Sequence, residues 1–420
     1  MPKRVLHFFS HIAWMVLAMC FINVVINYAG RLGYSLLLPE MIVDLGFGRM
    51  AGANIYNAYL IGYAVGAPLT GNLGDRLGAK PIILTSMGVM GLGLFLLGKS
   101  TGVATVAMAY GITGLGSSGI WIPTVALIQR WFALEYRGRV TGVLATGLGF
   151  GFSTLGILFP ILLPRLGWRG VWMFIGILAW TAIIPGLFAL RSSPGKSGVA
   201  PWGEPKGREN LHQLGKDSIT PPAPSIWVPL RQKQFWVLAM SYFAISAPTY
   251  SFSAFMVDYA RFQLYLPVSQ SSMVATVHGL FQIVGVLLLL GLSDKLGRRI
   301  TLGTSNTIIG FCIMGVLLVG GNTAYLFPLI AIIGICFGPT FPLYGVYAGD
   351  LYSPRLVGTV VGLWTPFYSM GTIFGNWIIG YSRDVMGTYT IGFSIAAALA
   401  LVSGYLILWG DKKGRQKNTG

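Results

Sequence analysis

The sequence predicts an all-α membrane protein in which twelve transmembrane helices form two pseudo-symmetric bundles of six. Three observations support this prediction. The composition is too apolar for a soluble protein, twelve apolar segments are each long enough to cross a bilayer, and one polar loop occurs twice at a fixed spacing.

The composition excludes a soluble globular chain. Of the 420 residues, 54% are apolar and only 10% are charged, and the mean hydropathy is +0.68. Soluble proteins carry about 25% charged residues, so this chain could not cover a globular surface with polar groups. Most of the 58 glycines and 22 prolines lie within apolar stretches, and they follow no repeat, which excludes a collagen-like or disordered chain.

Twelve apolar segments are long enough to cross a bilayer, which takes about 20 helical residues. One long polar stretch, rich in Pro, Gly and charge, separates the sixth segment from the seventh. We therefore expect a first six-helix bundle (1–190), a cytoplasmic linker (191–233), a second six-helix bundle (234–409) and a cytoplasmic tail (410–420). The predicted spans are 12–38, 52–73, 81–98, 103–128, 140–163, 169–190, 234–257, 268–292, 301–320, 323–347, 357–381 and 389–409.

Membrane topology explains the net charge of +17. With the N-terminus in the cytoplasm, 22 of the 29 Lys and Arg residues fall in cytoplasmic segments, six fall outside, and Arg31 alone lies within a span. This positive-inside pattern predicts a multi-pass protein of the cell (cytoplasmic) membrane with both termini in the cytoplasm. Nucleic-acid binding then loses its main support, and a monomer in the lipid bilayer is expected.

A polar loop follows the second span and returns after the eighth. The first copy reads Gly71-Asn-Leu-Gly-Asp75-Arg76-Leu-Gly78-Ala-Lys80, and the second reads Gly291-Leu-Ser-Asp294-Lys295-Leu-Gly297-Arg298-Arg299. Asp75 and Asp294 are 219 residues apart, and so are the glycines that follow them. A fixed offset between two six-span halves indicates a duplicated transporter.

These loops, the twelve spans and the repeat together resemble the major facilitator superfamily over nearly the whole chain. Its signature loop, Gly-x-x-x-Asp-Arg-x-Gly-x-Lys/Arg, lies between the second and third helices and is echoed between the eighth and ninth. The resemblance implies two helical bundles that rock about a central site near the membrane midplane. It also implies that Asp75, Arg76 and Asp294 hold a cytoplasmic gate through charge and helix-dipole contacts.

Other runs resemble particular groups of that superfamily. Gly114-Leu-Gly-Ser-Ser-Gly119, followed by Arg130-Trp131-Phe132, is similar to the monocarboxylate and oxalate–formate transporters. Those groups commonly place an Arg in helix eight, where this chain has Gly285-Val286-Leu287. The run Asn27-Tyr-Ala-Gly-Arg31 resembles the first helix of the organic-anion/cation symporters, in which an Arg contacts the anionic group of the substrate.

Arg31 is the residue from which a substrate class can be inferred. An Arg within a span costs at least about 2.5–3.5 kcal/mol and usually faces a cavity. All 12 acidic residues lie in loops or at span ends, so none neutralises it at mid-span. Asn27 lies one turn away on the same helix face. Because a guanidinium binds a carboxylate through two parallel hydrogen bonds, Arg31 is a candidate anion clamp. The alternative is an Arg that reaches the outer surface or bonds backbone carbonyls.

The offset of 219 residues adds candidate binding residues in spans two, seven and eight. The related positions are His278 with Tyr59, Gln282 with Tyr63, and Tyr250 with Arg31. His278 is also the candidate proton carrier, since the unperturbed pKa of His lies nearest neutrality. The alternative for His278 is a neutral side chain that hydrogen-bonds within the packing.

Aromatic residues in spans four, ten and eleven are candidates for contact with the apolar body of a substrate. The repeat images of two of them in span five are Ala145 and Gly149, so we expect a cavity with bulky rings on one side and open backbone on the other. The alternative for each ring is lipid-facing or interfacial packing. The candidates are Trp121, Tyr344, Trp364, Phe367 and Tyr368.

The expected function is secondary active transport of a small organic anion, above all a monocarboxylate, by alternating access with proton symport or anion exchange. The alternative is an exporter of neutral or amphipathic compounds, with Arg31 structural. An enzyme is not expected, because no nucleophile–base pair, phosphate-cradling loop or separate catalytic domain occurs. No cofactor or metal is expected, since Cys20, Cys312 and Cys336 fall in spans without metal-ligand or disulfide spacing.

Overall fold

The computed structural model describes residues 12–194, 199–203, 227–319, 321–353 and 356–410, which are helical apart from short connections. The first half of the chain forms α2 (Ile12–Leu32), α3 (Tyr34–Leu45), α4 (Arg49–Leu77), α5 (Ala79–Lys99), α6 (Val103–Ser118), α7 (Trp121–Trp131) and α8 (Leu134–Ala189). The second half forms α10 (Trp227–Leu230), α11 (Lys233–Ser246), η2 (Ala247–Ser251), α12 (Phe252–Phe262), α13 (Val268–Leu296), α14 (Arg298–Val319), α15 (Thr323–Phe337), α16 (Thr340–Leu351), α17 (Val357–Met386), α18 (Thr390–Tyr405) and η3 (Leu406–Gly410).

These elements combine into the twelve predicted spans, and the predicted fold class is confirmed. By length and composition, eight helical stretches of the described residues are able to cross a membrane, and one of them, α8, has 56 residues. At 1.5 Å per residue, α8 is far longer than a bilayer is thick. It is broken at Gly167, where φ is 64° and ψ is 174°, so it makes two crossings. The remaining spans, α4, α11–α12 and α17, are less apolar.

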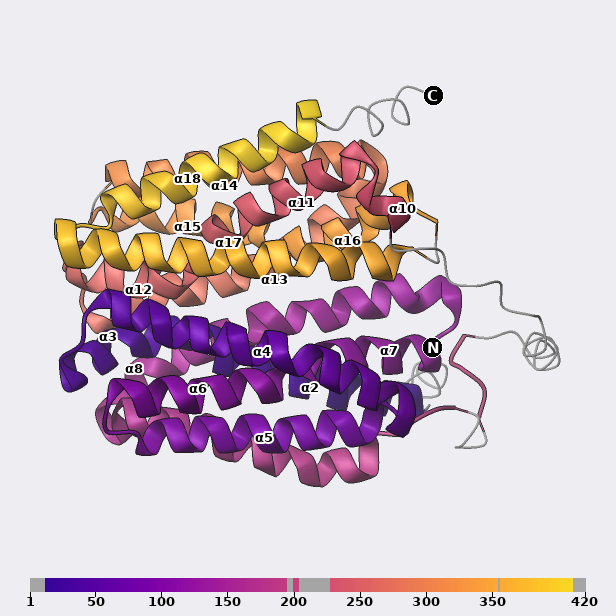
Figure 1. Ribbon diagram of the computed structural model, residues 1–420. Helices are drawn as coiled ribbons and strands as arrows, with labels where there is room; N and C mark the ends of the chain where they lie inside the picture. The colour runs from indigo at the N-terminus through magenta and orange to yellow at the C-terminus, as the bar shows by residue number, and fades with distance from the viewer. Residues whose placement is uncertain (1–11, 195–198, 204–226, 320, 354–355, 411–420) are drawn as a thin grey trace, which may run out of the picture.

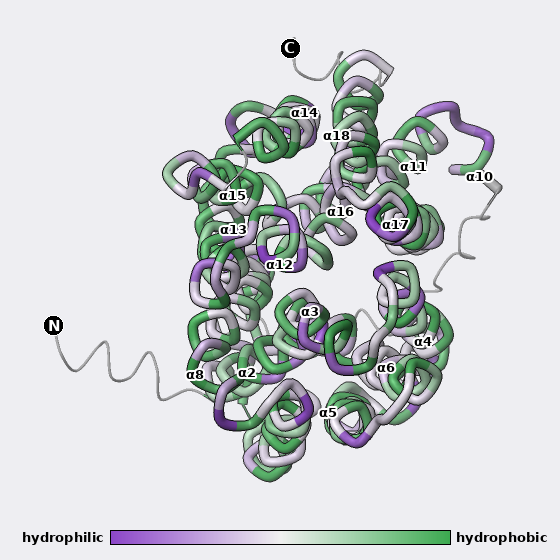
Figure 2. The backbone as a smooth tube through the Cα atoms, turned by 90° about the vertical axis from the view of Figure 1, so that its left-hand side faces the viewer, coloured by the Kyte–Doolittle hydropathy of each residue, from purple (hydrophilic) through white to green (hydrophobic). Residues whose placement is uncertain are grey.

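The spans form two bundles, with α2–α8 below and α11–α18 above in Figure 1. The end that carries α7, α10 and the last turn of α18 is called the linker end below, and the end that carries α3 and α12 is called the far end. Three helix pairs make most of the contact between the bundles: α8 with α13, α4 with α17, and α3 with α12 (Figure 2). The predicted domain boundaries at 190/191 and 233/234 stay a prediction, because most of the linker and the tail lie outside the described residues.

Four spans are interrupted along their length, and the repeat relates them in pairs. Span one is interrupted at Gly33 between α2 and α3, and span seven by the five-residue π-helix η2. Span four is interrupted after Gly119 between α6 and α7. Span ten is interrupted at Gly338 between α15 and α16, at the same repeat position. Interrupted helices are tolerated inside a membrane where they are covered by protein or line a cavity, so these four spans mark the place of the site.

The two bundles pack most tightly where α8 passes α13. A Cβ atom at Gly149 would lie 2.3 Å from the backbone oxygen of Gly279 and 2.7 Å from the side chain of Ile283. A Cβ atom at Gly142, on the same helix, would meet nothing within 4 Å. Gly149 is therefore required for close approach of the two halves, whereas Gly142 is not.

We expect opposite outcomes for Gly149→Ala and Gly142→Ala. Ala is about 1 kcal/mol better than Gly inside a helix, so Gly142→Ala should raise the thermal unfolding temperature slightly and leave transport unchanged. Overpacking costs about 1–3 kcal/mol, so Gly149→Ala should destabilise the contact between the bundles and slow transport. Thermal unfolding of the purified protein and uptake into proteoliposomes measure both effects. Equal behaviour of the two variants would show that this contact is unimportant.

Candidate functional site

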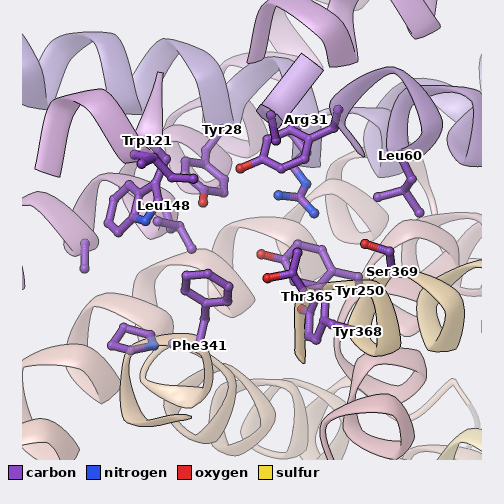
Figure 3. A pocket seen from close by; sticks show the side chains of 16 residues that line it. Tyr28, Arg31, Leu60, Trp121, Leu148, Tyr250, Phe341, Thr365, Tyr368 and Ser369 are labelled. Atoms are coloured by element: carbon purple, nitrogen blue, oxygen red, sulfur yellow. The ribbon is translucent and has the colours of Figure 1, made fainter. Parts of the chain in front are cut away.

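A cavity of about 110 Å³ lies between the two bundles, and all four interrupted spans contribute to its wall (Figure 3). The first half of the chain supplies Tyr28, Arg31, Leu60, Tyr63, Ala67, Trp121, Ile122, Ala145 and Leu148. The second half supplies Tyr250, Gly338, Phe341, Pro342, Thr365, Tyr368 and Ser369. A ligand in this cavity would therefore contact both halves at once.

Arg31 is the one charged side chain in this lining. It lies in the last turn of α2, is 9% exposed, and points its guanidinium into the cavity (Figure 3). Within the described part of the chain, no carboxylate forms an ion pair with it, and its Nε has no hydrogen-bond partner. The site thus presents a cation to the cavity, with no acid from the described residues beside it.

Three tyrosine rings surround the guanidinium. Its carbon lies 4.3 Å from the centre of the Tyr250 ring, 5.6 Å from that of Tyr59 and 5.7 Å from that of Tyr63. Each cation–π contact contributes about 0.5–2 kcal/mol, more when water is excluded. Ring faces stabilise the charge without accepting hydrogen bonds from the N–H groups, and among the described residues the Nε donor of Arg31 has no partner and stays available to a ligand.

The π-helix η2 positions the tyrosine that is nearest to Arg31. A π-turn adds one residue to a helical turn and is frequent at functional sites. Tyr250 within η2 is 4% exposed, and its ring makes edge-on contacts with Phe337 at 5.3 Å and Tyr368 at 5.5 Å between ring centres. These two contacts fix the face that Tyr250 turns toward the guanidinium.

Five of the twelve predicted binding residues line the cavity, and two others lie next to Arg31. Tyr59 is fully buried behind the wall, where its ring contacts the guanidinium and stacks on Tyr63 at 6.4 Å. Asn27 is 3% exposed and lies outside the lining. The five that line the cavity are Arg31, Tyr63, Trp121, Tyr250 and Tyr368.

His278 and Gln282 lie behind the wall on α13. His278 is fully buried, with its Nε2 at 3.0 Å from the Ser253 hydroxyl and its ring packed edge-on against Phe152. Gln282 is 1% exposed, and its backbone carbonyl packs against Gly338 of the cavity wall, where a Cβ atom at Gly338 would lie 2.3 Å from it. The structure therefore does not bring either side chain into the lining, and the proton-carrying role of His278 stays a prediction.

Three of the predicted aromatic residues pack within the second bundle instead of lining the cavity. The Tyr344 hydroxyl lies 2.7 Å from that of Ser241, and Trp364 Nε1 donates to the Phe235 carbonyl at 3.2 Å. Phe367 contacts the Trp236 ring edge-on at 5.9 Å. Their spacing on α16 and α17 is helical but does not place them on the face that the first bundle covers. Of the two span-five positions, Ala145 lines the cavity and Gly149 packs against α13.

Several residues of the wall were not predicted. Tyr28 precedes Arg31 by three positions, and Thr365 and Ser369 lie within one helical turn of Tyr368, so helical spacing around the predicted residues could have found them. Phe341 precedes the predicted Tyr344 by three positions, so the same spacing pointed to it as well. Its exposure to the cavity follows from the break in span ten, which the sequence marks only with Gly338 and the proline after it.

The predicted gate residues lie at the linker end. The side chain of Asp75 lies outside the described part of the structure, and Arg76 is exposed in the last turn of α4. Asp294 pairs with Arg298 at 2.9 Å, and Arg298 also pairs with Asp350 at 2.8 Å. These ion pairs lie entirely within the second half, so Asp294 does not bridge the bundles through them. The gating roles stay predictions.

At the far end, polar contacts between the halves close the molecule. The Asp384 carboxylate of α17 accepts hydrogen bonds from the backbone N–H groups of Arg49 at 2.8 Å and Met50 at 2.7 Å, the first two residues of α4. A carboxylate at a helix N-terminus is stabilised by the helix dipole. Deeper in the same interface, Asn376 Nδ2 donates to Asn57 Oδ1 at 2.7 Å.

A buried ion pair joins α4 to α12 at this end. Arg49 Nε lies 3.1 Å from Asp258 Oδ2, and the Asp258 carboxylate is fully buried. The Tyr389 hydroxyl also donates to Asp258, and Glu40 of α3 pairs with Arg261 of α12. We call the contacts of Arg49, Asp258 and Asp384 the far-end latch. All three residues lie outside the spans or at span ends in the sequence, where nothing indicates that they pair.

Comparison with known proteins agrees with this architecture. The family model described as Major Facilitator Superfamily matches residues 20–268 and 238–420. A probable hexose phosphate transport protein of Chlamydia pneumoniae is 23% identical over 95% of this chain and 91% of its own length. A gallate transporter of Pseudomonas putida is 23% identical over 93% of this chain and 91% of its own.

A solved structure, described as the crystal structure of a D-xylose-proton symporter, has the same fold. It superposes with a TM-score of 0.74, covering 96% of this chain and 99% of that one at 14% identity. At that identity the likeness shows the fold alone, whereas the family model covers nearly the whole chain. This chain, a multi-pass integral membrane protein, therefore belongs to the Major Facilitator Superfamily.

Proposed function

We propose that this protein is a secondary transporter of a small organic anion, above all a monocarboxylate, which it moves by alternating access between its two bundles. The observation that carries the proposal is the state of Arg31: a buried guanidinium in a cavity shared by both halves, with tyrosine faces around it and no described acid beside it. Arg31 binds the carboxylate, and Tyr63, Tyr250 and Tyr368 surround it.

The electrostatics of the cavity support a substrate with one negative charge. Two opposite unit charges 4 Å apart attract with about 4 kcal/mol at an effective dielectric of 20. A monocarboxylate gains this attraction and leaves the complex neutral. A dianion would leave one excess negative charge in the cavity, since the described lining offers no second cation.

The size of the cavity and the substrates for which the relatives are named support the same class. At about 10–15 Å³ for each water-sized group, 110 Å³ accommodates roughly seven to eleven such groups. That size suits a small carboxylate better than a sugar phosphate. The two relatives are named for a carboxylate and for a phosphate ester, both of which are anions.

We place the linker end in the cytoplasm, because the predicted loops there hold most of the Lys and Arg residues. The far end, which the latch closes, then faces outward, and the substrate reaches Arg31 from the cytoplasmic side in this conformation. Returning the empty carrier would move an uncompensated Arg31. Proton symport or exchange of one anion for another both avoid a full uncompensated charge movement.

Uptake into proteoliposomes tests the proposed function. We expect accumulation of radiolabelled lactate, pyruvate or benzoate, and no accumulation of the neutral analogues lactamide and benzamide. A pH gradient should drive the uptake if protons travel with the anion, whereas preloading with unlabelled anion should accelerate it if the protein is an exchanger. Transport of the neutral amides at the same rate as the acids would overturn the proposal and favour an exporter of neutral compounds.

A further inference from the structure

The cavity continues beyond Arg31 along a wall of aromatic rings. From the guanidinium the path runs to Tyr250, whose ring centre lies 5.5 Å from that of Tyr368. The ring of Tyr368 lies in turn 6.4 Å from that of Phe341. Figure 3 shows this row on the second-half side of the cavity, with Phe341 displaced to one side of Arg31.

The first half covers the same stretch from the opposite side. Trp121 and Leu148 lie across the cavity from Phe341, with Tyr28 between them and Arg31 (Figure 3). Trp121 is the first residue of α7 and Phe341 is the second residue of α16, so the related breaks in spans four and ten place both rings. A ligand anchored at Arg31 extends between these two walls.

We infer that the transported anion is an aromatic monocarboxylate with a single ring, a class that benzoate represents. Its carboxylate binds Arg31, and its ring lies between Trp121 of the first half and Phe341 of the second. This inference rests on the proposed function and narrows the substrate class of the same site. A short aliphatic acid would contact Arg31 alone and leave the two rings against water, whereas a flat ring contacts both.

The position of the ring also connects binding to transport. Trp121 and Phe341 belong to different bundles, so a ring between them makes contacts that depend on how the bundles approach each other. A ligand shifts a conformational equilibrium only by its difference in affinity for the two states. An aromatic ring that contacts both halves binds the two conformations with different affinities. A carboxylate that contacts only Arg31 of the first half discriminates less between them.

Binding to the purified full-length protein tests this inference, with benzoate, cyclohexanecarboxylate and pyruvate as probes in isothermal titration calorimetry. We expect benzoate to bind on the order of tenfold more tightly than pyruvate, and more tightly than the saturated ring of similar size. Trp121→Leu and Phe341→Leu should each weaken benzoate binding several-fold more than they weaken pyruvate binding. The matched control is Phe311→Leu, since Phe311 is 65% exposed on α14 and lies outside the cavity.

Three outcomes would overturn the inference. Pyruvate that binds as tightly as benzoate would show that the ring contributes nothing, while leaving an anion carrier intact. Equal weakening of benzoate by Phe311→Leu would show that the effect is one of general stability. If none of the three carboxylates binds, the inference is wrong. If none of them is taken up into proteoliposomes either, the proposed function is wrong as well.

Discussion

Replacing Arg31 with Gln should lower monocarboxylate uptake about a hundredfold. The variant removes the one charged side chain from the cavity lining. A hydrogen bond to a charged group contributes about 1.5–3 kcal/mol, and a bidentate carboxylate contact makes two of them, so the loss amounts to at least about two factors of ten. Arg31→Lys keeps the charge without the planar fork and should fall between the two.

Initial rates of benzoate and pyruvate uptake into proteoliposomes measure this effect, with thermal unfolding to confirm that the variants fold. Arg165→Gln is the matched control, because Arg165 is exposed at the end of a span and outside the cavity. If Arg31→Gln leaves anion uptake unchanged, Arg31 does not bind the anion and its role is structural.

Replacing Arg49 with Gln should shift the protein strongly toward conformations open at the far end. The variant leaves the fully buried Asp258 carboxylate without its cationic partner across the two halves. Removing one partner of a buried ion pair costs about 3–5 kcal/mol, because the remaining charge is uncompensated. Only the closed conformation bears this cost, since opening lets water reach Asp258. The ratio of open to closed molecules should therefore rise by at least about a hundredfold.

Thiol labelling from outside measures this shift. A cysteine in place of Asn57, which bonds to Asn376 across the two halves, reports opening of the far end. The background replaces the three native buried cysteines with Ala. We expect membrane-impermeant maleimide to react much faster when Arg49→Gln is added, and anion uptake to slow because closure is disfavoured.

Two further variants separate the latch from a general loss of charge. Adding Asp258→Asn to Arg49→Gln removes the unpaired carboxylate and should return the labelling rate most of the way. Arg169→Gln breaks the ion pair with Asp44, which is exposed and lies within the first half, and should change labelling little. If Arg169→Gln accelerates labelling as much as Arg49→Gln, the latch does not control the far end.

The fold could be predicted almost entirely from the sequence. Apolar segments of bilayer length fix the number of spans, because a membrane allows few ways to satisfy the backbone. The two Asp loops at a constant offset fix the duplication. The interruptions of spans one, four, seven and ten were not predicted as such, since glycines such as Gly119 are frequent in membrane helices and most of them do not break one.

The site could be predicted only in part. Arg31 was evident because a charge within an apolar span has few structural uses, and the repeat offset led from it to Tyr250. The same offset led to His278, but equivalence between repeats does not settle which neighbour a side chain faces. Close packing of Gly279 of α13 against α8 leaves His278 facing Ser253 and Phe152, outside the cavity.

The far-end latch could not be predicted because its partners are remote in sequence. Arg49 and Asp258 are separated by 209 residues, and Arg49 and Asp384 by 335. Charges at the ends of spans are ordinary in a membrane protein, where they contact headgroups and water. Only the arrangement of the two bundles identifies which acid meets which base.

The capping of α4 by Asp384 bears on the energy balance of the transport cycle. Helices α4 and α17 run antiparallel side by side (Figure 1), and each carries an Asp near its C-terminal end: Asp75 on α4 and Asp384 on α17. Because the helices are antiparallel, the end of each that carries its Asp lies where the other helix begins. The helix dipole of α4 attracts Asp384 at the far end, and the dipole of α17 offers the same attraction to an Asp at the linker end. Opening one face while closing the opposite one would then exchange one carboxylate–helix contact for another of the same kind, which we expect to reduce the free-energy difference between the two conformations. A smaller free-energy difference keeps both conformations populated and so favours turnover of the carrier, whereas the gradients of the substrate and any coupling ion set the direction of net flow.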